Sequence, residues 1–195
     1  MELPLFPLSS IVLPDGLLPL RLFERRYIDM VKDCFRQDTG FGVCLIKSGR
    51  EAGGVATPYP RGTRVSIIDF DQGADGLLHI TAKGEEEFRL TGYVTSDSGL
   101  LVGEVEPIAP GAPTTMLPDD ELLSQKLELI LNYLETDVRF EHQRLDDADW
   151  VCHRLLEVLP LATEAKYELL QMDSNRERLD ALKALQIEIA ERPAS

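Results

Sequence analysis

The spacing of apolar residues changes once along this 195-residue chain, and that change constrains the fold more than any other feature. Up to residue 108, apolar side chains come in short runs or alternate with polar ones, separated by Gly, Pro and Asp, as in strands joined by turns. From residue 118 onward they recur every three or four positions, which is the helical period. The sequence therefore predicts an α+β fold with a β-rich subdomain over 1–108, a linker over 109–117 and a helical subdomain over 118–195.

The β-rich part is predicted to consist mainly of short strands. We expect them at 3–6, 17–23, 41–47, 63–72, 76–84, 86–96 and 98–108. The pair Asp75-Gly76 predicts a tight hairpin, because both residues tolerate positive φ. Such a series favours a small, closed antiparallel pseudo-barrel that leaves few strand edges exposed.

One helix interrupts these strands. Its start is predicted just after residue 23, and Gly40 is predicted to end it. The apolar face is predicted to comprise Phe23, Tyr27, Met30, Val31 and Cys34.

About four packed helices are predicted after the proline-containing linker. Asp147 or Asp149 is a suitable N-cap for one helix, and Ser174 for another, where Glu177 predicts a capping box. The apolar positions that define three of the helices are Leu123, Leu127, Ile130, Leu131 and Leu134; Val151, Leu155, Val158 and Leu159; and Leu179, Leu182, Leu185 and Ile189.

The composition restricts the partners and the compartment. The formal net charge is −14, so a polyanion such as nucleic acid or an anionic membrane surface is a disfavoured partner. No run of about 18 apolar residues predicts a membrane span, and the N-terminus does not resemble a signal peptide. Three cysteines without a CxxC pair are typical of free thiols in a reducing compartment, so we expect a cytoplasmic protein.

No catalytic, metal-binding or cofactor-binding motif is found. The chain lacks GxxxxGK[ST], GxGxxG and GxSxG, and its histidines (His79, His142 and His153) do not have the spacing of a metal site. Cys34 and Cys44 lie in apolar contexts that favour inert thiols. Cys152 with a histidine distant in sequence leaves a small hydrolase as an alternative. We otherwise predict no catalytic residues, no metal and no cofactor.

Arg25 and Arg26 are the candidate binding residues. They lie in the first turn of the predicted helix, where two positive charges oppose the helix dipole. In an acidic chain this placement indicates either intramolecular ion pairs or a surface that binds an acidic protein partner.

The opening LPLFPL (3–8), the segment LPLRLF (18–23) before the helix, FGVCLI (41–46) and the ending LLQMDSNRERL (169–179) together resemble the N-terminal domain of Lon-type ATP-dependent proteases. The resemblance covers nearly the whole chain. It implies a PUA-like pseudo-barrel followed by a helical bundle, in a domain that recognises substrate proteins. It implies neither ATPase nor protease activity, and it transfers no ligand-contacting residue.

These observations predict a non-catalytic module that binds protein or peptide segments, including misfolded ones. The contact is expected in apolar grooves at the sheet–helix junction, with Arg25 and Arg26 providing charge selection. An RNA-binding PUA-like protein and a small hydrolase remain alternatives. The sequence leaves open the client motif, the oligomeric state and the pathway.

Overall fold

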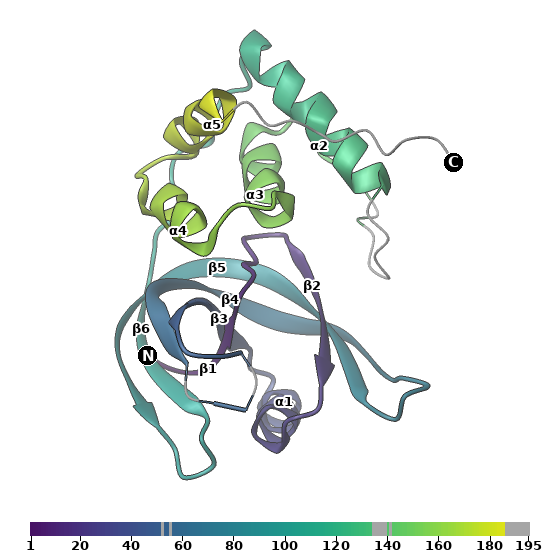
Figure 1. Ribbon diagram of the computed structural model, residues 1–195, viewed down its shortest axis with the longest axis vertical. Coiled ribbons are helices and arrows are strands. Elements are labelled where there is room, and N and C mark those ends of the chain that lie inside the picture. The colour runs from purple at the N-terminus through teal and green to yellow at the C-terminus, as the bar shows by residue number, and fades with distance from the viewer. Residues whose placement is uncertain (52, 55, 134–139, 141, 186–195) are drawn as a thin grey trace.

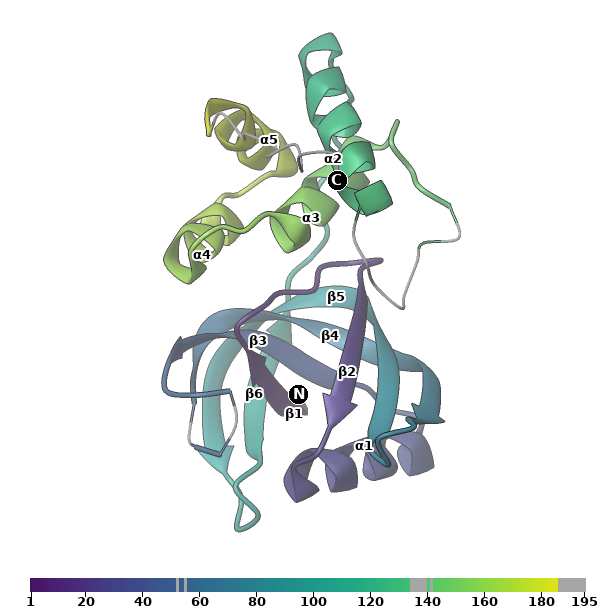
Figure 2. The same cartoon turned by 45° about the vertical axis from the view of Figure 1, so that its right-hand side comes forward.

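The computed structural model describes residues 1–51, 53–54, 56–133, 140 and 142–185. In this part of the chain, six strands form one sheet that curls into a barrel, and five α-helices accompany it. Figures 1 and 2 show four of the helices gathered at one end of the barrel and α1 across the opposite end. The predicted α+β fold is confirmed. The division into subdomains at 108 and 118 stays a prediction.

The sheet has the strand order β2-β5-β4-β3-β1-β6, and an additional pairing of β5 with β6 closes it. β1 pairs in parallel with β3, and the other pairings are antiparallel. The bounds are β1 Glu2–Leu8, β2 Leu17–Leu22, β3 Phe41–Ser48, β4 Thr57–Gln72, β5 Leu78–Thr95 and β6 Leu101–Pro107.

The two strands predicted at 76–84 and 86–96 are one continuous strand, β5. Gly84, where the prediction placed a break, keeps the strand intact and lets another segment approach it closely. A Cβ at this position would lie 2.1 Å from the carbonyl oxygen of Leu13, and the Gly84 N–H donates to Gly16 O at 2.9 Å. The glycine therefore marks a close contact between distant segments and does not mark a turn.

The β4–β5 hairpin also differs from its prediction. Gly76 has a positive φ of 79°, but Asp75 is not among the residues with positive φ. The Gly73 N–H donates to Leu77 O at 2.9 Å, and the Gly76 N–H donates to Gly73 O at 2.8 Å. The loop is therefore longer than the two-residue turn that the Asp-Gly pair predicts.

α1, Arg25–Gln37, packs Tyr27, Met30, Val31 and Cys34 of its predicted apolar face into the barrel core. Phe23, also predicted on that face, precedes the helix and is exposed. Asp38, with φ 53°, ends the helix in the left-handed conformation, two residues before the stop predicted at Gly40. Gly40 is instead required because a Cβ there would lie 2.0 Å from Val65 O.

The helical end comprises a short 3₁₀ turn (Pro118–Asp120) followed by α2 Glu121–Tyr133, α3 Ala148–Val158, α4 Thr163–Gln171 and α5 Asn175–Ala184. Asp147 caps α3 by accepting the N–H groups of Asp149 and Trp150. Ser174 caps α5 through Glu177 N, but the Glu177 carboxylate accepts the Asp173 N–H, so the predicted capping box is only half formed. The predicted apolar positions Leu134 and Ile189 lie outside the described residues.

Candidate functional site

The barrel and the helices share one apolar core. Ile11, Leu13 and Leu45 from the barrel belong to the same buried cluster as Leu127, Val151 and Leu155 from α2 and α3. This buried cluster fills part of the junction at which the apolar grooves are predicted.

A buried ion pair fastens α3 to the loop between β1 and β2. Arg154 Nε lies 2.8 Å from Glu157 Oε2, and Glu157 Oε1 accepts the Leu13 N–H at 2.7 Å. Arg154 also donates to Pro14 O at 3.0 Å. Burial raises the pKa of Glu157 to about 7, against the opposing effect of the Arg154 charge. The pair lies inside the chain and links α3 to the β1–β2 loop, as in a structural anchor, although Arg154 Nη1 has no hydrogen-bond partner among the described residues.

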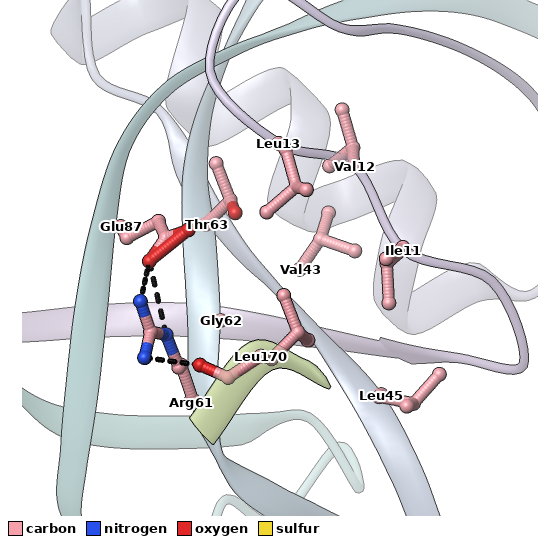
Figure 3. Close-up of a pocket in the computed structure, with 10 residues that line it drawn as sticks. All are labelled: Ile11, Val12, Leu13, Val43, Leu45, Arg61, Gly62, Thr63, Glu87 and Leu170. Carbon is pink, nitrogen blue, oxygen red and sulfur yellow. Dashed lines mark hydrogen bonds and ion pairs between the residues drawn. The ribbon is translucent and has the colours of Figure 1, made fainter. Parts of the chain in front are cut away.

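Figure 3 shows a second polar link between the barrel and the helices. Arg61 on β4 donates to the Glu87 carboxylate on β5, with Nε at 2.9 Å, and to the carbonyl of Leu170 at the end of α4. The neighbouring cavity has a volume of about 10 Å³, about the space of one water molecule. No peptide segment fits there.

A wider cleft of about 600 Å³ opens next to this link. Residues 108–112 line part of it, together with charged or polar groups such as Glu87, Asp149 and Arg178. Most of these polar groups have partners: Arg178 pairs with Glu87 at 3.7 Å, and Asn175 donates to Asp149 at 2.9 Å. The junction therefore offers a mixed cleft with internally paired charges rather than the predicted apolar groove.

Cys152, the candidate nucleophile of the hydrolase alternative, lies in the core of this region. Its side chain is fully buried, and burial raises the pKa of the thiol to about 12. The neighbouring His153 accepts a hydrogen bond from Asn175 at 3.2 Å, and burial lowers the pKa of its imidazole to about 4. A protonated, inaccessible thiol beside a neutral imidazole that bonds elsewhere lacks the features of an activated nucleophile.

Across the described residues, no group of three or more His, Cys, Asp or Glu side chains is placed to hold a metal ion. Nor does any helix in these residues combine the length and the apolar character that crossing a membrane demands.

The two candidate arginines have different environments. The Arg25 side chain is 83% exposed and pairs with Asp29 at 2.7 Å, and that carboxylate raises the pKa of Arg25. Arg26 is only 13% exposed. It pairs with Glu24 at 3.0 Å, donates to Gly99 O at 2.8 Å and lies over the ring of Tyr27. Arg26 thus fixes the start of α1 to the β5–β6 loop, and Arg25 alone of the two faces solvent. Their role in protein binding stays a prediction.

An apolar hollow lies between α1 and the β4–β5 hairpin. Figure 2 shows these two elements at the end of the barrel opposite the later helices. We call this hollow the α1–hairpin groove; its volume is about 510 Å³. It is lined by Leu22, Phe23, Ile28, Lys32, Phe70, Asp71, Gln72, Gly76, Leu77 and Leu78.

Large apolar side chains stand exposed in and around this groove. Phe23 and Phe70 are each 61% exposed, and Ile68 is 53% exposed. Phe35 on α1 packs edge-to-face on Phe70, with ring centroids 4.9 Å apart. A rimmed cluster of exposed aromatic and aliphatic groups is typical of a surface that contacts another molecule.

The sequence pattern does not predict an exposed cluster at these residues. It places Phe70 in a strand and Phe23 on the apolar face of a helix, which are positions typical of a core. Phe70 lies on the part of β4 beyond Val65, where β3 no longer pairs with it, and Phe23 lies in the connection between β2 and α1.

The comparisons with protein families, with single proteins and with solved structures agree with one another. The family described as "ATP-dependent protease La (LON) substrate-binding domain" matches residues 2–185. A protein named Lon protease 2, from Myxococcus xanthus, is 30% identical over 94 residues, which are 47% of this chain and 11% of that protein. The chain thus aligns with only a small part of that relative.

Two solved structures are similar over nearly the whole chain. One is a Lon N-terminal domain protein from Xanthomonas campestris, which is 41% identical with a TM-score of 0.75, covering 94% of this chain and 98% of that one. The other is the N-terminal domain of a Mycobacterium avium complex Lon protease, which is 18% identical with a TM-score of 0.63, covering 94% and 97%. The second similarity shows the fold alone.

Proposed function

The chain belongs to the family of Lon substrate-binding domains, and from this premise we propose that it binds exposed apolar segments of other proteins in the α1–hairpin groove. The matched family is that of the substrate-binding domain, so residues 2–185 contain no Lon ATPase or protease domain. The predicted resemblance to this family is confirmed. The peptide as the bound species, and misfolded clients in particular, are our proposal.

The observation that carries the proposal is the exposure of Phe23 and Phe70 on either side of an open hollow. Covering such a ring removes apolar surface from water and contributes about 1.5–3 kcal/mol when burial is complete. Because association has a large entropic cost, a few such contacts are typical of modest affinity. A module with modest affinity can accept and release many different segments.

The basic residues support a protein over RNA as the partner. In the described part of the chain, Arg21, Arg61 and Arg64 on the barrel each pair with a carboxylate. Arg176 and Lys183 on α5 both pair with the buried Asp120. Phosphate binding needs basic groups that are free to replace counterions, and these are neutralised within the chain.

The environment of Cys152 supports a binding function over hydrolysis, since its thiol is buried and protonated. All three cysteines are free and buried, which supports the predicted cytoplasmic location as part of this proposal.

Fluorescence anisotropy with a labelled apolar peptide, unstructured on its own, tests the proposal. The double variant Phe23→Ser/Phe70→Ser is expected to bind about tenfold or more weakly, because both exposed rings are lost. The control Val94→Ser/Tyr133→Ser removes two equally exposed apolar groups, 67% and 78% exposed, away from the groove.

The control is expected to bind like the unmodified chain, and urea unfolding checks that both variants fold. Equal loss of affinity in both variants, or no loss in the Phe23 and Phe70 variant, would contradict the proposal.

A further inference from the structure

One edge of β4 beside the α1–hairpin groove lacks a neighbouring strand among those described. β3 pairs with β4 only as far as Val65, whereas β4 continues to Gln72. At the hairpin, Gly73 donates its N–H to Leu77 O. Because the backbone groups of successive residues in an antiparallel ladder point to opposite sides, those of Phe70 and Gln72 point away from β5. Residues 70–72 thus present an unpaired edge to the groove.

The N–H groups of this edge are already occupied. Phe70 donates to Asp69 Oδ1 at 2.9 Å, and Gln72 donates to Asp71 Oδ1 at 2.8 Å. A carboxylate that accepts an edge N–H must itself lie at that edge. The edge therefore offers carbonyl and carboxylate oxygens, all of them acceptors. Addition of a further strand needs free donors as well, so strand addition is disfavoured here.

The acidic groups at this edge lack counter-charges. Within the part of the chain that the structure describes, Asp69 and Asp71 make no ion pair, whereas the neighbouring Asp75 pairs with Arg21. On the α1 side of the groove, Arg25 and Lys32 share the one carboxylate of Asp29, at 2.7 and 3.8 Å, so one positive charge is left over. Arg36 pairs with Asp33 at 3.0 Å. The two unpaired carboxylates of Asp69 and Asp71 outnumber this one excess cation, so the net charge of these groups is negative.

We propose that the α1–hairpin groove selects apolar segments that carry Lys or Arg at their flanks. This inference rests on the proposed function and names its substrate class. A guanidinium has five donors and no acceptor, which matches an edge that offers only acceptors. The exposed rings of Phe23 and Phe70 cover the apolar part of the segment, and a cation can also lie on their faces. The net charge of −14 adds a long-range attraction for basic segments. The preference is opposite to the acidic partner predicted for Arg25 and Arg26.

Three labelled peptides with one shared apolar core test this selection on the full chain. They carry two Arg, two Gln or two Glu at the flanks, and their dissociation constants are measured by anisotropy at low and high salt. The Arg-flanked peptide is expected to bind about fivefold more tightly than the Glu-flanked one, since two exposed ion pairs each contribute modestly. The difference is expected to shrink at high salt.

The variant Asp69→Asn/Asp71→Asn removes both charges but keeps side-chain oxygens that can accept the edge N–H groups. It is expected to lose the preference for Arg flanks and to retain binding of the Gln-flanked peptide. The control Glu104→Gln/Glu106→Gln changes the net charge equally, at two exposed positions on β6. It is expected to keep the preference.

Equal affinity for the Arg- and Glu-flanked peptides, or loss of the preference in both double variants, would overturn the inference while apolar binding still stands. Absence of binding for all three peptides would overturn the proposed function itself, and this inference with it.

Discussion

The junction between barrel and helices contains a cleft, and so does the α1–hairpin groove, but their side chains have opposite environments. At the junction, Arg154, Glu157 and Arg61 find partners within the chain, and the apolar groups around them are buried. At the groove, Phe23 and Phe70 remain exposed. A hollow whose charged groups pair within the chain holds the fold together. A hollow whose groups lack partners is available to another molecule.

The largest effect is expected where the junction's ion pair is broken. Glu157→Ala leaves the fully buried Arg154 guanidinium without its carboxylate and the Leu13 N–H without its acceptor. The free energy of unfolding in urea is expected to fall by about 3–5 kcal/mol. Glu164→Ala, at an exposed position of α4, serves as the control. If the free energy of unfolding falls by less than about 1 kcal/mol, this ion pair stabilises the fold no more than an exposed ion pair does.

A smaller effect on the free energy of unfolding is expected from a change of pH, through His153 at the junction. The pKa of His153 falls to about 4 in the fold because burial disfavours the imidazolium, whereas the unfolded chain binds this proton near the ordinary value of 6.5. Stability from the neutral imidazole is therefore complete above pH 6.5 and is lost as the pH falls toward 4. The loss is expected to reach roughly 2–3 kcal/mol.

Urea titrations of the unmodified chain and of His153→Gln between pH 7 and pH 4 measure this loss. The variant is expected to lose about 2–3 kcal/mol less than the unmodified chain over this range, since glutamine does not titrate. The raised pKa of Glu157, which favours the fold as the pH falls, acts on both proteins alike. Parallel curves for the two proteins would exclude His153 as the source.

The two neighbouring arginines of α1 test the same comparison within one helix turn. Arg26→Ala removes the bond to Gly99 O and the pair with Glu24, so a loss of about 1–2 kcal/mol is expected. Arg25→Ala, at the exposed neighbour, is expected to leave the urea midpoint unchanged. If Arg25 selects acidic clients, as the sequence predicts, the same variant weakens binding of the Glu-flanked peptide only.

The smallest effect on stability is expected at the groove. Phe23→Ala removes a ring that is 61% exposed, so the free energy of unfolding is expected to change by less than about 0.5 kcal/mol. Leu155→Ala in the junction core, where the side chain is fully buried, is the comparison and is expected to cost about 2–5 kcal/mol. Similar losses for the two would show that the groove also supports the fold.

The type and order of the elements could be predicted from the sequence because they depend on local features. The change of apolar period separates strands from helices, and an N-cap needs only a side chain next to the first turn. Asp147 and Ser174 were found in this way, and both cap their helices. The family could also be recognised from the sequence, through motifs near both ends of the chain.

Only the tertiary structure decided what depends on segments far apart in sequence. Gly84 continues a strand because the chain at Leu13 passes close to it, and Arg26 is covered because the β5–β6 loop reaches it. Phe23 and Phe70 have the sequence context of core residues, but the fold leaves most of each side chain uncovered. Local spacing determines which face of an element is apolar. What covers that face depends on where the rest of the chain packs, and this determined the position of the candidate site.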